Sequence, residues 1–322
     1  MEKRQRCRFL SVSKSTRAFW REARATRGFS FFDFIHGYIY ARWPYHYIGI
    51  GKGDHYLVQK FTPLIKLWRI LFPDTARTSL QHSTNQASHT VADGYHGKTL
   101  PLEKASQLLT INEPIRVPDL EQVIPYVRAR TILIENPEQI AVIDCPCRAS
   151  LPNPCLPHDV CMIVGEPFVS FVIEHQPKRS RRITSVEALQ ILETEDEKGH
   201  VHHAFFKDAM LDRFYAICNC CSCCCGAINA HKNDIPMLES SGYVAVVRED
   251  QCIGCGICAA YCQFDALQIK SELRMVDTIS CMGCGVCIDK CPEGAIKLVR
   301  DEGKGVPLEI HSLMDEIVGQ MD

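Results

Sequence analysis

QCIGCGICAAYC (251–262) and SCMGCGVCIDKC (280–291) are two copies of one pattern, offset by 29 residues. Each copy spaces its four cysteines as C-x2-C-x2-C-x3-C and places glycines between the first three. The match continues downstream, where Ala266 corresponds to Ala295 and Leu267 to Ile296. A tight loop of this kind can wrap a metal centre, because glycine lets backbone N–H groups approach the ligand sulfurs. The repeat therefore predicts two matched metal sites.

The repeat resembles the bacterial two-cluster [4Fe–4S] ferredoxins, in which the fourth cysteine of each run ligates the other cluster. The resemblance covers about 55 residues and implies a small pseudo-twofold fold. Two zinc sites or one degenerate cluster are the alternatives. Pro292 follows Cys291 as the ferredoxin pattern expects, but Gln263 follows Cys262, which leaves the reduction potential open. The implied ligands are Cys252, Cys255, Cys258 and Cys291 for one cluster, and Cys281, Cys284, Cys287 and Cys262 for the other.

Ten further cysteines lie upstream, in DCPCRASLPNPCLPHDVC (144–161) and CNCCSCCC (218–225). Prolines punctuate the first stretch and indicate a loop. Crowded thiols without a metal would repel as thiolates or oxidise, so we expect at least one further iron–sulfur cluster. A structural zinc site and unmetallated reactive thiols are alternatives, whereas the isolated Cys7 is expected to be a spectator. The ten candidate ligands are Cys145, Cys147, Cys155, Cys161, Cys218, Cys220, Cys221, Cys223, Cys224 and Cys225.

The order of these motifs is also informative. A CPCR motif, an ICNCC-x-CCC run and a two-cluster ferredoxin domain together are similar to a group of uncharacterised ferredoxin-domain proteins of anaerobic bacteria. That similarity covers most of residues 100–299 and implies an anaerobic redox setting, without implying a reaction.

Composition narrows the class of protein. The 322 residues carry a net charge of −2 and are 46% hydrophobic, which is typical of a globular chain and gives no indication of nucleic-acid binding. An apolar signal-peptide region and a membrane-spanning run of about 18 apolar residues are both missing. We therefore expect a reducing cytoplasm, in which the cysteines are metal ligands rather than disulfides.

The first 72 residues allow two interpretations. Residues 1–28 contain nine Lys or Arg against two Glu, and form either a solvated tail or a docking segment for an acidic partner or anionic lipid. Apolar side chains from Phe61 to Phe72 fall on one helical face, suited to the core or to a membrane interface. A peripheral membrane contact through residues 1–72 is therefore an open expectation beside a cytoplasmic location.

The predicted fold class is α+β, with a mixed α/β cysteine-rich domain followed by the ferredoxin-like domain. The expected divisions are a basic and aromatic extension with a polar linker (1–99, the linker spanning 74–98), the cysteine-rich domain (100–243), the ferredoxin domain (244–299) and a tail (300–322). Strands are expected at 131–136 and 140–145. Helices are expected after a capping box at Thr184 and Glu187, across 118–130 with a break at Pro125, and over 203–217, ending near Cys218.

Four polar side chains near these cysteines are candidate functional residues. His200, His202 and His203 can ligate metal or relay protons, although a structural role is the alternative. Arg148 can donate hydrogen bonds to a cluster or a bound anion. Sequence motifs for a nucleotide phosphate loop, a dinucleotide-binding turn and attached haem are not found.

The predicted function is electron transfer, in which single electrons from an unidentified redox partner protein pass through the C-terminal clusters. Two alternatives stay open. The cysteines between 145 and 225 can form a substrate-reducing site fed by the ferredoxin module, or the chain can carry clusters as an assembly or sensor protein.

Overall fold

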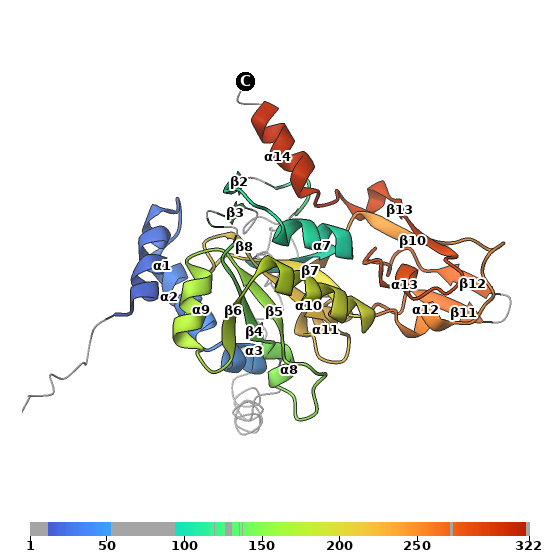
Figure 1. Cartoon of the computed structure of the whole chain (residues 1–322), viewed down its shortest axis with the longest axis horizontal. Coiled ribbons are helices and arrows are strands. Elements are labelled where there is room, and N and C mark those ends of the chain that lie inside the picture. The colour runs from blue at the N-terminus through green and yellow to red at the C-terminus, as the bar shows by residue number, and fades with distance from the viewer. Residues whose placement is uncertain are drawn as a thin grey trace, which may run out of the picture.

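A seven-stranded sheet forms the centre of the computed structural model, which describes residues 12–52, 94–118, 120–125, 131–134, 136, 138–270 and 273–319. Its strand order is β6-β4-β5-β8-β7-β1-β9, and a smaller cysteine-rich module lies at one end of the long axis (Figure 1). Neighbouring strands are antiparallel except for β1 and β9. The strands are β1 (Tyr95–Leu100), β4 (Ile140–Asp144), β5 (Asp159–Val164), β6 (Ser180–Ile183), β7 (Val201–Lys207), β8 (Arg213–Cys220) and β9 (Leu238–Glu239).

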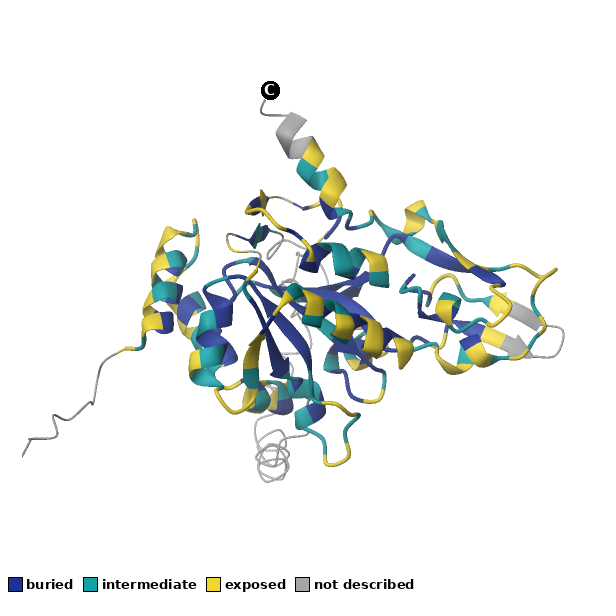
Figure 2. Ribbon diagram, viewed as in Figure 1, coloured by how far each residue is buried: buried dark blue, intermediate teal, exposed yellow. Residues whose placement is uncertain are grey.

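Helices cover both faces of this sheet, and the strand pleat decides which side chain meets which layer. Ala141 and Ile143 of β4 enter one core, whereas Ile140 and Val142 enter the other. The strands are consequently the most buried part of the molecule (Figure 2). One layer contains α1 (Lys14–Ala25), α2 (Phe31–Arg42), α3 (Pro44–Lys52), α9 (Phe168–His175) and α11 (Gly226–His231). The other contains α7 (Leu102–Leu109), α10 (Ser185–Glu197), α14 (Ile310–Gly319) and the hairpin of β2 (Ile115–Val117) and β3 (Ile132–Ile134).

The basic N-terminal segment is folded from residue 14 onward, so the expectation of a solvated tail is wrong there. Phe19 on α1 is fully buried, with its ring edge-on to Phe168 and Phe171 of α9. The basic side chains lie on the opposite side of an amphipathic helix, which explains why the segment looks like a tail in sequence.

The polar linker expected at 74–98 is wrong over its last residues, because β1 begins at Tyr95 and pairs with β7 and β9. The same strand crosses the boundary expected at residue 99. The predicted helix from Phe61 to Phe72 and the isolated Cys7 lie outside the described residues. Within the described part of the chain, every helix is too short or too polar to cross a bilayer.

The helix predicted over 203–217 is wrong. Strands β7 and β8 occupy this segment and pair along their whole length, with a turn between them in which Leu211 and Asp212 have positive φ. Both strands are central and buried on both faces, so their apolar side chains run almost continuously and mimic helical spacing. The helix predicted over 118–130 is also not formed where the structure describes it, since Leu120 to Ile124 makes a single turn.

Other local predictions are confirmed. The expected strands correspond to β3 and β4. Helix α10 begins after Thr184, whose hydroxyl accepts a hydrogen bond from the Glu187 amide at 3.2 Å. The carboxylate of Glu187 does not complete the capping box, because it pairs with Arg181 instead.

The C-terminal module has two antiparallel strand pairs and two one-turn helices. Its elements are β10 (Tyr243–Val247) with β13 (Ile296–Arg300), β11 (Leu267–Lys270) with β12 (Leu273–Val276), α12 (Ile257–Ala260) and α13 (Val286–Asp289). Each one-turn helix begins after a left-handed glycine of the cysteine repeat, Gly256 or Gly285. The predicted α+β class with a ferredoxin-like C-terminal part is therefore confirmed.

Candidate metal centres

The eight cysteines of the C-terminal repeat gather around two separate pockets. The first three cysteines of each run line one pocket, and the fourth cysteine of the run reaches the pocket of the other run. Cys252, Cys255, Cys258 and Cys291 surround one pocket, and Cys281, Cys284, Cys287 and Cys262 surround the other.

The backbone around these pockets suits iron–sulfur clusters. The amide of Ala266 donates to the Cys262 sulfur at 3.3 Å, and the amide of Ala295 donates to the Cys291 sulfur at 3.2 Å. Gly283 has φ +63°, and a Cβ there would lie 2.2 Å from the Tyr243 carbonyl oxygen, so only glycine fits this loop. Amide donors aimed at cysteine sulfur are the contacts that stabilise bound clusters.

Burial makes these thiols dependent on a cation. It raises the pKa of Cys284 to about 12 and also raises the pKa of Cys258. A buried thiolate is unfavourable without positive charge, and a metal supplies that charge. The residues present therefore fit two metal clusters held by thiolates.

Residues 245–298 match the family described as the 4Fe-4S dicluster domain. The C-terminal module is a ferredoxin-type domain. The chain has no match among curated proteins. Since the ferredoxin domain accounts for the C-terminal cysteines alone, the upstream cysteines must be interpreted from their own geometry.

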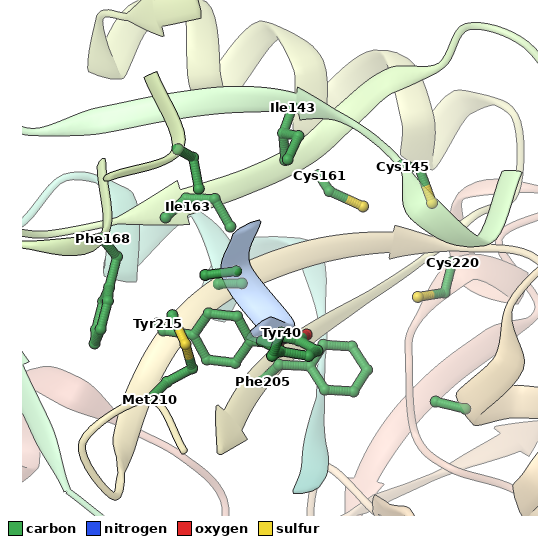
Figure 3. Close-up of a cluster of buried hydrophobic side chains, with 14 of the residues drawn as sticks. Tyr40, Ile143, Cys145, Cys161, Ile163, Phe168, Phe205, Met210, Tyr215 and Cys220 are labelled. Atoms are coloured by element: carbon green, nitrogen blue, oxygen red, sulfur yellow. The ribbon is translucent and has the colours of Figure 1, made fainter. Parts of the chain in front are cut away.

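Eight upstream cysteines line a cavity of about 80 Å³ between the sheet and α2, α3 and α11, and six of them belong to no other cysteine group. We call these six the inner cysteines. Figure 3 shows the sulfur atoms of Cys145, Cys161 and Cys220 around one space beside Tyr40 and Tyr215. The inner cysteines are Cys145, Cys147, Cys161, Cys218, Cys220 and Cys225.

The inner thiols perturb one another strongly. Hydrogen bonding from the Cys225 thiol, helped by His203, lowers the pKa of Cys220 to about 6 despite its burial. Hydrogen bonding with Cys145 and Cys225 likewise lowers the pKa of Cys147. Thiols that line one apolar cavity are candidates to ligate a shared metal centre.

Cys155, Cys221, Cys223 and Cys224 form a second upstream group, which we call the outer cysteines. Their four sulfur atoms all lie within 4.8 Å of one another. Cys155 comes from the loop after α8 (Pro146–Ala149), and the other three come from the turn between β8 and α11. All eighteen described cysteines are free thiols.

The surroundings of these cysteines differ in part from the prediction. The stretch 144–161 is not wholly loop, because Pro146–Ala149 forms a helical turn and Cys161 lies on β5. Cys218 and Cys220 lie on a strand rather than at a helix end.

The four polar side chains predicted near the cysteines also differ in what they contact. Arg148 is buried, and its guanidinium lies 2.7 Å from the Glu195 carboxylate, so its charge has a partner within the protein. His200 also contacts Glu195, and His202 contacts Asn219, so both have structural partners. His203 has no hydrogen-bond partner for either ring nitrogen among the described residues, and its proximity helps to lower the pKa of the Cys220 thiol.

Sequence reasoning missed three residues that organise this region. The Lys52 ammonium donates to the Cys224 carbonyl at 3.1 Å and to the Cys147 carbonyl at 3.3 Å, tying both cysteine segments to α3. Tyr215 and Tyr40 join their hydroxyls at 2.6 Å in the wall of the inner cavity. None of the three belongs to a recognisable motif, and only the fold brings them to the cysteines.

Gln263 connects the ferredoxin domain to the outer cysteines. Its side-chain oxygen accepts from the Ser222 amide, and its side-chain nitrogen donates to the Gly199 carbonyl, both at 2.8 Å. The ring of Tyr261 lies against Gly199 at the same contact. The residue that departs from the ferredoxin pattern is thus a contact between the two halves of the chain.

Proposed function

We propose that this protein relays single electrons between an external redox partner and the inner cysteine cavity through the ferredoxin domain. Cys252, Cys255, Cys258 and Cys291 would hold the distal [4Fe–4S] cluster, and Cys281, Cys284, Cys287 and Cys262 the proximal one. Bound [4Fe–4S] clusters supply reversible one-electron chemistry. The chain's own residues bury the ligands, donate hydrogen bonds to their sulfurs and fix the order of the sites.

The asymmetry of the ferredoxin domain carries this proposal. Cys262 and Cys284 of the proximal set pack against the core that contains the inner cysteines. The distal pocket is lined by residues 252–296 of the ferredoxin domain alone, and Cys255 at its edge is exposed. Electrons would therefore enter at the distal site and leave through the proximal site toward the upstream domain.

The exposed apolar side chains beside the distal pocket suit a protein partner. Ile253 is 65% exposed and Ile257 is 41% exposed, and both flank Cys255. We propose that the external redox partner docks here, with Ile253→Lys slowing reduction by reduced flavodoxin but not by dithionite. Ile279→Lys is the control, because Ile279 is 86% exposed but lines another pocket together with His231 of α11.

The inner cysteines would hold a further iron–sulfur cluster through four of their six thiols. The test is anaerobic purification of the full chain with iron and sulfide counts and EPR of the reduced protein. About twelve irons with about twelve sulfides is the expected result, since each cubane contains four of each. About eight of each would show that the inner cysteines hold no cluster.

A second candidate function is substrate reduction at the inner cavity, and the tyrosines favour it. Tyr40 and Tyr215 place a hydrogen-bonded pair of hydroxyls in the same cavity as the thiols, where a small substrate would find a proton donor. Cyanide serves as the probe, because it binds iron only at an open coordination position. A cyanide-induced shift of the EPR signal that is additional to those of the two ferredoxin clusters would favour the reductase, and an unchanged signal would favour pure relay.

A further inference from the structure

The outer cysteines have the spacing of ligands that share a single ion. The Cys155 sulfur lies 2.9 Å from Cys223 and 3.8 Å from Cys221. The Cys223 sulfur lies 3.3 Å from Cys221 and 3.5 Å from Cys224. Four thiolates around one tetrahedral ion with bonds of about 2.3 Å have sulfurs about 3.8 Å apart, so the observed group needs only slight expansion.

A cubane cluster would require a wider arrangement. Each of its four ligands binds a different iron, so the ligating sulfurs are held farther apart than when they share one ion. The ferredoxin domain provides an internal comparison. All eight of its cysteines are described, and no three of them bring their sulfurs within 4.8 Å of one another, as the outer cysteines do. The two kinds of site are thus distinguishable within one molecule.

The position of the outer cysteines indicates what an ion would do there. Cys155 is more than sixty residues from its partners in sequence, on the proline-rich loop that separates α8 from β5. Cys221 and Cys224 also line the inner cavity, whereas Cys223 faces solvent. An ion bound to this group would join the two loops across the outside of the inner cavity and close that wall.

We propose that Cys155, Cys221, Cys223 and Cys224 bind one thiophilic divalent ion, Zn²⁺ or Fe²⁺, in a tetrahedral site separate from every iron–sulfur cluster of the chain. Tetrahedral four-sulfur coordination is the geometry that these two metals adopt in proteins. The site holds the loop of Cys155 against the turn of residues 221–224. The site does not depend on the relay proposed above, because that relay uses iron–sulfur clusters and this site binds a single ion without sulfide.

The test is metal analysis of the anaerobically purified full chain and of the double variant Cys155→Ala/Cys223→Ala. The expected result is loss of one equivalent of zinc or iron with no loss of sulfide. Ser222→Ala is the matched control, since it alters the same turn without removing a sulfur. Loss of several irons together with their sulfides would overturn the proposal, because the outer cysteines would then hold a cluster. Unchanged metal content would overturn it as well.

Two spectroscopic arms identify the ion in the wild-type chain. Zinc would show four sulfur neighbours at about 2.3 Å in its X-ray absorption spectrum. Iron would appear in the Mössbauer spectrum as a one-iron component apart from the clusters. A zinc shell rich in nitrogen or oxygen, or iron present only with matching sulfide, would count against the proposal.

Cysteine alkylation provides a readout that survives if the double variant fails to fold. In the protein as isolated, Cys155 and Cys223 should resist iodoacetamide, although Cys223 is exposed to solvent. After treatment with EDTA they should be alkylated, while the sulfide content stays constant. Equal alkylation before and after chelation would show that no ion protects them.

Discussion

Glu195→Gln tests whether the buried ion pair beneath the cysteine sites stabilises the upstream domain. Arg148 and Glu195 are each only 1% exposed and meet at 2.7 Å. Burial favours the protonated acid, but hydrogen bonds from His200, Lys198 and Arg148 outweigh it and lower the pKa of Glu195 from 4.5 to about 2. This shift corresponds to about 3 kcal/mol, and removing one charge of a buried pair typically costs about 3–5 kcal/mol.

The assay is anaerobic urea unfolding followed by circular dichroism, with Glu187→Gln as the control. Glu187 lies on the same helix and also pairs with an arginine, but that pair is exposed, with Arg181 at 49% and Glu187 at 39%. An exposed pair contributes at most about 1 kcal/mol, so the control should unfold close to the wild type. Equal midpoints for Glu195→Gln and Glu187→Gln would refute the reasoning.

The pH dependence gives an independent check of the same carboxylate. Because folding lowers the pKa of Glu195, its stabilisation is fully present above pH 4.5 and is lost as the pH falls toward about 2. The stability difference between the wild type and Glu195→Gln should therefore shrink as the pH is lowered from neutral to about 3. A difference that stays constant over this range would show that another group is responsible.

Two further substitutions probe the ferredoxin domain. Gln263→Pro restores the ferredoxin pattern and removes two hydrogen bonds of about 1 kcal/mol each, so hydrogen exchange at the Ser222 amide should accelerate while the iron content stays constant; unchanged exchange would contradict the contact. Gly283→Ala places a Cβ 2.2 Å from the Tyr243 carbonyl oxygen, so we expect loss of the proximal cluster's iron. Gly256→Ala has open space around the new Cβ, so this variant should retain more of its iron. Equal iron losses would show that the positive φ of both glycines, and not the steric contact, determines cluster binding.

The ferredoxin domain was predictable from sequence because its chemistry is local. Three ligands of each set lie within seven residues, and the repeat supplies the fourth. Glycine at the left-handed positions, such as Gly256 and Gly285, is required by the same loops that carry the ligands. The cysteine spacing and the glycine positions therefore predict the same loops, and the family match covers this part of the chain.

The division of the upstream cysteines was not predictable from spacing. Cys220 and Cys221 are adjacent in sequence, yet Cys220 is an inner cysteine and Cys221 an outer one, because β8 ends between them. Cys161 meets Cys218 because β5 pairs with β8, and the sequence gives no local sign of that pairing. Because the sequence predicted a helix over 203–217, the prediction left out β8, the strand whose pairing orders these thiols. Long-range strand pairing decided the site, and periodicity alone cannot predict it.

The one irregularity of the cysteine repeat acquires a physical explanation from the fold. Both halves of the ferredoxin domain form the same loop, and the half ending at Cys262 reaches the turn of the outer cysteines through Gln263, with the neighbouring Tyr261 against Gly199. A proline at 263 has neither the amide oxygen that accepts from Ser222 nor the amide nitrogen that donates to Gly199. Pro292 occupies the equivalent position in the other half. The departure from the ferredoxin pattern thus falls at the junction with the upstream cysteines. The electron relay proposed here would need a fixed separation between the ferredoxin domain and the upstream cysteines, and the two hydrogen bonds of Gln263 join the two at this point.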